Sequence, residues 1–162
     1  MSKLNLFRSH YSPGRGIIQI NDHDPKKESQ VLNLASLCIK NNLSQCFLVD
    51  SSLAGIWPAF NTLKKVGVSL VFGFLVNFCS DAEDKSENSN VSAHKNIIFV
   101  KNEAGYKSLI KISTKAHVDF FHEFPRLDYN YFHSVYNENL QLAVPFYDSF
   151  LFNNAMEEKQ CV

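Results

Sequence analysis

The chain has 162 residues, which is enough for one domain with its own hydrophobic core. Lys and Arg together number 16, as do Asp and Glu, so the formal net charge is zero. A neutral chain has no overall field that favours nucleic acid, and we expect no strong nucleic-acid binding by the chain itself. No apolar stretch approaches the roughly 18 residues of a membrane span, and the four cysteines form no CxxC pair. We therefore expect one cytoplasmic domain over residues 1–162, without a membrane segment or a disulfide framework.

The first part of the chain predicts two strands separated by a helix. A short strand at residues 4–7 runs into a turn-rich loop that contains glycine. Ser29 is expected to cap a helix that ends at the asparagine pair Asn41 and Asn42. The apolar run at residues 45–50 then indicates a buried parallel strand, which would deliver Asp50 to its carboxyl end.

The middle of the chain predicts a helix, a strand and a loop. A helix is expected over residues 57–66, because Pro58 suits a first helical turn and Gly67 suits a C-terminal stop. Residues 68–76 indicate a second buried strand. Residues 80–92 are acidic, polar and without periodicity, which predicts an exposed and mobile loop.

The last part predicts a strand at residues 96–100, a helix after it, and a final strand at residues 140–147. An aromatic segment at residues 120–136 lies between them. Strands that alternate with helices predict an α/β fold with mostly parallel strands. In such folds chemistry collects at the carboxyl ends of the strands, here near Arg8, Asp50, Leu75 and Asp148.

Four segments carry motifs in an informative order. The most specific is KNEAGYKSLIKIS at residues 101–113, and the others lie at residues 8–16, 48–55 and 67–73. Together they resemble the PHP domain (polymerase and histidinol phosphatase) of bacterial C-family replicative DNA polymerases, the DNA polymerase III alpha subunits. The resemblance implies a shortened, partial or distorted PHP-type β/α barrel.

Active PHP domains hold metal ions with His, Asp and Glu side chains and use them to hydrolyse phosphoesters. Carried onto this chain, the resemblance implies a degenerate site, because six of the ligand positions hold Leu6, Arg8, Arg15, Ser51, Leu75 and Lys95. Asp50 is the one retained ligand position. Cations at three of these positions would repel a divalent ion, and one arginine is expected to pair with Asp50 instead. We therefore expect no metal cofactor and name no catalytic residue.

The resemblance favours a non-catalytic binding or structural module in DNA replication, which docks onto a polymerase or proofreading exonuclease subunit. The aromatic segment is the candidate surface for this docking. One alternative is a metal-dependent phosphoesterase or 3′-to-5′ exonuclease that uses divalent metal ions and relocated ligands, namely Asp50, His10, His94 and Asp148. Another is a scaffold in which Arg8 and Arg15 hold a phosphate.

Overall fold

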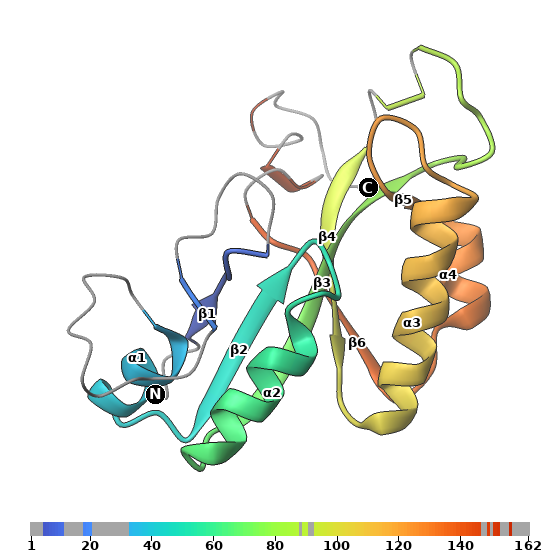
Figure 1. The fold of residues 1–162 in the computed structure, drawn as a ribbon. Helices are drawn as coiled ribbons and strands as arrows, with labels where there is room; N and C mark the ends of the chain where they lie inside the picture. Colours follow the sequence, from blue (N-terminus) through green and yellow to red (C-terminus); the bar gives the residue numbers. More distant parts are fainter. Residues whose placement is uncertain are drawn as a thin grey trace. The chain divides into compact units, whose positions relative to one another are not determined.

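Strands and helices alternate along most of the chain, and two strands follow each other in its middle, as the sequence predicts (Figure 1). The strands are β1 (Leu6–Phe7), β2 (Gln45–Asp50), β3 (Ser69–Cys79), β4 (His94–Val100), β5 (Arg126–Asp128) and β6 (Leu140–Ala143). The helices are α1 (Leu34–Lys40), α2 (Ile56–Lys65), α3 (Glu103–Val118) and α4 (Tyr129–Val135). This computed structural model describes residues 5–11, 18–20, 33–87, 89–90, 93–146, 149, 151–152 and 156. None of the helices within these residues has the length and apolar character needed to cross a membrane.

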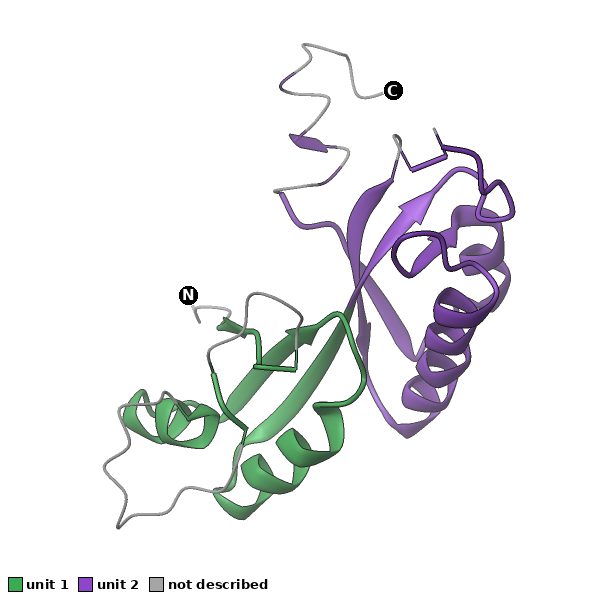
Figure 2. Cartoon of the chain, turned by 45° about the horizontal axis from the view of Figure 1, so that its top comes forward, with its two compact units in different colours: residues 1–74 green, residues 75–162 purple. Residues whose placement is uncertain are grey.

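The described strands form an open and mostly parallel sheet. Hydrogen bonds order them β1-β2-β3-β4-β6, and β5 pairs with β3 outside this path. The pairs β1–β2, β2–β3 and β3–β5 are parallel, whereas β4 and β6 are antiparallel. The predicted α/β class with mostly parallel strands is therefore confirmed. The chain divides within β3 into two compact units, unit 1 (residues 1–74) and unit 2 (residues 75–162), and a single domain over residues 1–162 stays a prediction (Figure 2).

Unit 1 contains a parallel arrangement of β1, β2 and the first part of β3. Leu6 lies opposite Phe47, and Gln45 lies opposite Ser69. The helices α1 and α2 contact each other. The core side chains of this unit include Leu34, Cys38, Leu48, Leu63 and Phe72. Most of β2 is buried, as is typical of a parallel strand, and its predicted bounds are confirmed.

The start of α1 differs from the prediction. Asn33 caps this helix, and its side chain accepts hydrogen bonds from the backbone N–H groups of Ala35 and Ser36. The predicted N-cap, Ser29, is therefore wrong for α1, and that residue lies outside the described part of the chain. Both side chains suit a cap, and sequence alone did not distinguish them. The predicted end of the helix is confirmed, since Asn42 has a φ of 51°, which asparagine tolerates better than most residues.

Helix α2 matches its prediction to within one residue at each end. Pro58 lies in its first turn, where the missing N–H removes no intrahelical hydrogen bond. Gly67 follows the helix with a φ of 73°, the left-handed conformation that glycine adopts without steric cost.

Strand β3 is longer than predicted and ends at Cys79. Phe74, Val76 and Phe78 are all buried, so alternate residues continue to fill the core beyond the predicted end. Leu75 therefore lies inside the strand. Its predicted place near the carboxyl end of a strand is wrong.

Unit 2 contains the end of β3, three further strands and two helices. Asn77 in β3 lies opposite Arg126 in β5, and β4 pairs with β6. The helices α3 and α4 lie side by side (Figure 1). Its core side chains include Phe78, Ile98, Leu109, Ile112, Leu127 and Leu140. The sequence predicted β4 and α3, but it did not predict that the aromatic segment would contain β5 and α4.

The last strand is shorter than predicted and runs in the opposite direction to its neighbour. β6 ends at Ala143, and Leu142 lies opposite Ile98 in β4. Pro145 follows soon after and has no N–H to donate to a strand, which opposes continuation of the ladder. Asp148 therefore does not directly follow a strand as predicted, and it lies outside the described residues.

The segment KNEAGY at residues 101–106 joins β4 to α3, and its contacts explain its composition. Asn102 caps α3 by accepting a hydrogen bond from the N–H of Gly105 at 3.0 Å. The Lys101 N–H donates to the carbonyl of Asn139 at 3.0 Å, and the Asn102 amide donates to the Asn139 side chain at 2.8 Å. A Cβ atom on Gly105 would lie 2.3 Å from the same Asn139 carbonyl oxygen. Glycine is therefore required for the close approach of α3 to the chain that enters β6.

Candidate functional site

The carboxylate of Asp50 lies fully buried at the end of β2, bound to Ser9 beyond the end of β1. The Ser9 N–H donates to Asp50 Oδ1 at 2.9 Å, and the Ser9 hydroxyl donates to Asp50 Oδ2 at 2.5 Å. The β1–β2 register explains this pairing, because Phe7 lies opposite Leu48 and two further residues on each strand lead to Ser9 and Asp50. Hydrogen bonds to an ionised carboxylate are shorter and stronger than neutral ones. Both Asp50 oxygens thus serve to join two strands.

The loop after β1 continues this network. Ser9 Oγ also accepts a hydrogen bond from the Tyr11 N–H at 3.2 Å. The His10 N–H donates to the Ile18 carbonyl at 3.0 Å, and His10 Nδ1 donates to the same oxygen at 3.2 Å. His10, a proposed ligand of the enzymatic alternative, is therefore bound to the loop backbone through its Nδ1 atom.

The turn before α2 packs closely against Asp50. A Cβ atom on Gly55 would lie 3.2 Å from Asp50 Oδ2, 3.0 Å from Tyr11 Cδ2 and 3.2 Å from Ile20 Cδ1. Three loop segments therefore converge on the end of β2. Two of these three neighbouring atoms are carbon atoms, which cannot serve as ligands of a cation.

The other predicted site positions have varied surroundings. Leu6 lies on β1 with 52% of its surface exposed, and Arg8 and Ser51 are half-buried in the same unit. Arg15 and Asp148 lie outside the described residues. The ion pair between an arginine and Asp50 stays a prediction.

Three further positions belong to unit 2. Leu75 lies within β3, and His94 and Lys95 open β4, all three half-buried. The His94 carbonyl accepts a hydrogen bond from the Asn96 side chain at 3.4 Å. Across the described ranges of the chain, no group of three or more His, Cys, Asp or Glu side chains could share a metal ion. The donors present there do not fit the metal cluster that active PHP domains hold.

The sequence missed a buried arginine in unit 2. Arg126 in β5 is fully buried, and its five N–H donors all reach acceptors. Nε donates to the Phe120 carbonyl at 3.1 Å, and Nη1 donates to the side chains of Ser89 and Asn90, each at 2.9 Å. Nη2 donates to the carbonyls of Ala82, at 3.2 Å, and Asp84.

Arg126 therefore binds the described part of the 80–92 segment to the loop that follows α3. Most of residues 81–87 are exposed, as the sequence predicts, and the mobility of the segment stays a prediction. The signal in the sequence was an arginine between Pro125 and Leu127, a tripeptide that resembles one in the polymerase PHP domains. Composition gave no sign that this charge is buried.

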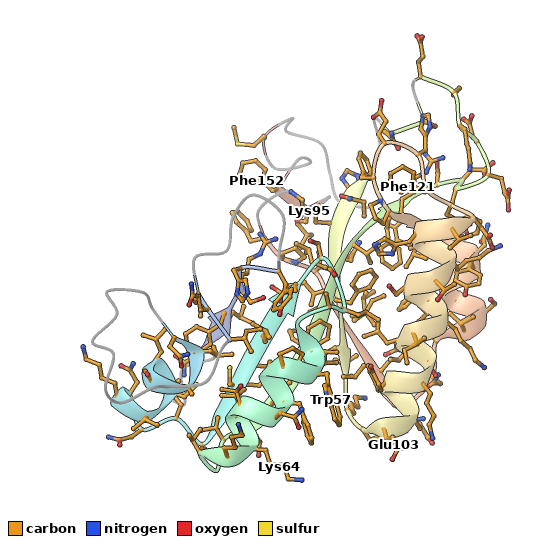
Figure 3. The ribbon with its side chains drawn as sticks, viewed as in Figure 1. Trp57, Lys64, Lys95, Glu103, Phe121 and Phe152 are labelled. Atoms are coloured by element: carbon orange, nitrogen blue, oxygen red, sulfur yellow. The ribbon has the colours of Figure 1, made fainter. Side chains whose placement is uncertain are left out.

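The aromatic segment serves both the core and the surface. Phe120 and Phe132 are buried, and the ring of Phe132 packs edge-on against Phe78. Phe121 and Tyr136 are exposed, and Figure 3 marks Phe121 in the loop after α3. The aromatic segment thus contains both exposed rings and rings that are packed in the core.

The PHP domain family model matches residues 8–153, and the chain belongs to this family. It is similar to the DNA polymerase III subunit alpha of Borreliella burgdorferi, with 27% identity over 105 residues. That match covers 63% of this chain and 9% of the relative. It is also similar to the DNA polymerase III subunit alpha of Aquifex aeolicus, with 29% identity over 85 residues, which are 48% of this chain and 7% of the relative. The chain thus spans less than a tenth of the length of these relatives, and its recognition as a PHP domain related to DNA polymerase III alpha subunits is confirmed.

Proposed function

We propose that this PHP domain is a non-catalytic binding or structural module in DNA replication. The observation that carries the proposal is the buried Asp50 carboxylate, whose two oxygens accept hydrogen bonds from Ser9. We also infer that the open sheet is part of a shortened PHP-type β/α barrel. A cytoplasmic location belongs to the same proposal.

Hydrolysis by a PHP domain needs metal ions that activate water, and those ions need several anionic or imidazole ligands. Each Asp50 oxygen already accepts one hydrogen bond from Ser9, so Asp50 has only part of its lone pairs left for an ion and would need further ligands beside it. Leu6 offers no lone pair at its position, and Arg8 offers only positive charge. The residue types in unit 1 therefore support a role for Asp50 in the fold.

Docking needs no metal ion, so it is compatible with this arrangement. The curated relatives are replicative polymerase subunits, and on this basis we propose a polymerase or proofreading exonuclease subunit as the partner. The exposed rings of Phe121, Tyr129 and Tyr136 are the candidate contacts. Aromatic residues are enriched in protein interfaces, where one ring can contribute much of the binding free energy.

The catalytic question is tested on the purified chain and on Asp50→Asn, His94→Ala and Asp148→Ala variants. Bound metal is measured by mass spectrometry, and hydrolysis of a phosphodiester and of a 3′-labelled single strand is followed with Mn²⁺ or Zn²⁺. We expect metal well below one ion per chain and no hydrolysis that depends on these residues. Stoichiometric metal and hydrolysis that both disappear in the variants would establish instead the metal-dependent phosphoesterase or exonuclease.

The docking question is tested by cross-linking the tagged chain in its native cells and identifying the captured proteins. We expect a polymerase or exonuclease subunit, recovered in smaller amount with Phe121→Ser. Ile110→Ser is a matched control, because Ile110 is an exposed apolar residue of the same unit that lies on α3 outside the aromatic segment. Recovery of no replication protein would contradict the proposal.

A further inference from the structure

Helix α2 exposes two aromatic rings on the side that does not face the core. Trp57 is 67% exposed and Phe60 is 42% exposed, whereas Ala59, Thr62 and Leu63 on the opposite side are buried. The two rings are one helical turn apart and nearly parallel, with centroids 5.8 Å apart and an interplanar angle of 22°. Tryptophan is usually well buried, so this much exposed indole surface indicates a use outside the core.

Positive charge accompanies these rings. Lys64 Nζ lies 5.7 Å from the centroid of the Phe60 ring, and Figure 3 marks Trp57 and Lys64 along α2. Lys65 follows in the sequence, and α2 contains no acidic residue. Trp57, Phe60 and Lys64 together are named the α2 face.

The formal charge of unit 1 has the same sign as the charge of the α2 face. Residues 1–74 contain eight Lys and Arg and four Asp and Glu, a formal charge of +4, and one of those four acids is the buried Asp50. Residues 75–162 contain eight Lys and Arg and twelve Asp and Glu, a formal charge of −4. The zero net charge of the chain therefore conceals a basic first unit, which favours a polyanion as the partner of this surface.

We propose that the α2 face binds single-stranded nucleic acid, with bases stacked on Trp57 and Phe60 and a phosphate near Lys64. Proteins that bind single strands without sequence preference combine exposed aromatic rings with cations in this way. A duplex keeps its base faces stacked inside, and an acidic peptide gains little from two parallel rings. The inference is independent of the proposed replication partner. It is compatible with a weak affinity of the whole chain for nucleic acid.

The test uses the full chain, because Trp57 is its single tryptophan and its fluorescence reports on this surface alone. The chain is titrated with an oligothymidylate of about 12 nucleotides, within the usual range of site sizes. We expect saturable quenching at low salt. Phe60→Ala should weaken binding about 5- to 100-fold, which corresponds to the loss of one stacked base. Lys64→Gln should reduce the slope of log K against log salt by about 0.7.

The controls lie in unit 2. Phe146 and Lys107 are also exposed, so Phe146→Ala and Lys107→Gln should leave the titration unchanged. Circular dichroism should show that all four variants are folded, because each change is at the surface. Three results would each overturn the proposal. The first is no saturable quenching up to about 1 mM strand, a concentration well above usual nonspecific dissociation constants. The second is full affinity in Phe60→Ala, and the third is equal quenching by polyglutamate. The last of these would indicate an acidic protein surface as the partner.

Discussion

Replacing Gly105 with alanine should destabilise the chain, although alanine is the better helix former. The added Cβ would lie 2.3 Å from the backbone oxygen of Asn139, so the chain leading into β6 must move. Overpacking of this kind costs about 1–3 kcal/mol. Movement of Asn139 also weakens its hydrogen bonds with Lys101 and Asn102, at about 1 kcal/mol each.

The gain in helix propensity offsets about 1 kcal/mol of this cost. The net change in the free energy of unfolding for Gly105→Ala is therefore a loss of about 2–4 kcal/mol. For a chain of this size that corresponds to a fall in Tm of about 4–16 °C. Urea and thermal unfolding followed by circular dichroism measure both quantities.

Ala104→Gly provides the matched control, because Ala104 is exposed in the same helical turn. It should lose about 0.5–1 kcal/mol, the ordinary cost of glycine in a helix. If Gly105→Ala were neutral or stabilising, the contact with Asn139 would not be what requires glycine, and the reasoning would be refuted.

Three further predictions concern buried polar groups. Arg126→Met should lower the free energy of unfolding by about 3–5 kcal/mol, because it leaves buried acceptors without donors. Amide hydrogen exchange should also rise in residues 82–90, which contain several of these acceptors. Unchanged exchange there would contradict the role of this side chain. Ser9→Ala should cost about 1.5–3 kcal/mol, the usual value for a hydrogen bond to a charged group, whereas Ser52→Ala, at a more exposed serine, should cost less in the same urea titration. Burial raises the pKa of the Cys79 thiol above its ordinary value of 9.0, so the thiol contributes its full stability below that pH and loses it as the pH rises further. Cys79→Ala should therefore flatten the alkaline decrease in stability, and an equally steep decrease in the variant would argue against this assignment.

Much of the secondary structure was predictable because its determinants are local. The apolar run that ends at Asp50 was recognised as a buried parallel strand, and Pro58 and Gly67 located α2 to within one residue. One error occurs where two local solutions are equally good. Ser29 and Asn33 both suit an N-cap, and only the folded backbone shows that Asn33 caps the helix.

The candidate site was predictable only in its central residue. The resemblance identified Asp50, but it gave no reason to connect Asp50 with Ser9, which is 41 residues away. That contact depends on the register between β1 and β2, and a register is a long-range property. Arg126 was missed for the same reason, since its acceptors come from two separate loops.

The sequence by itself determined the α/β class, most of the strands and helices, and the kinship with the polymerase PHP domains. These follow from hydrophobic periodicity, turn residues and a specific motif, which are all readable within short windows. The tertiary structure alone decided that both oxygens of Asp50 bind Ser9, that Gly105 meets Asn139, and that the guanidinium of Arg126 is buried. The physical reason is that burial and hydrogen-bond partners depend on which distant segments pack together, and no local pattern contains that information.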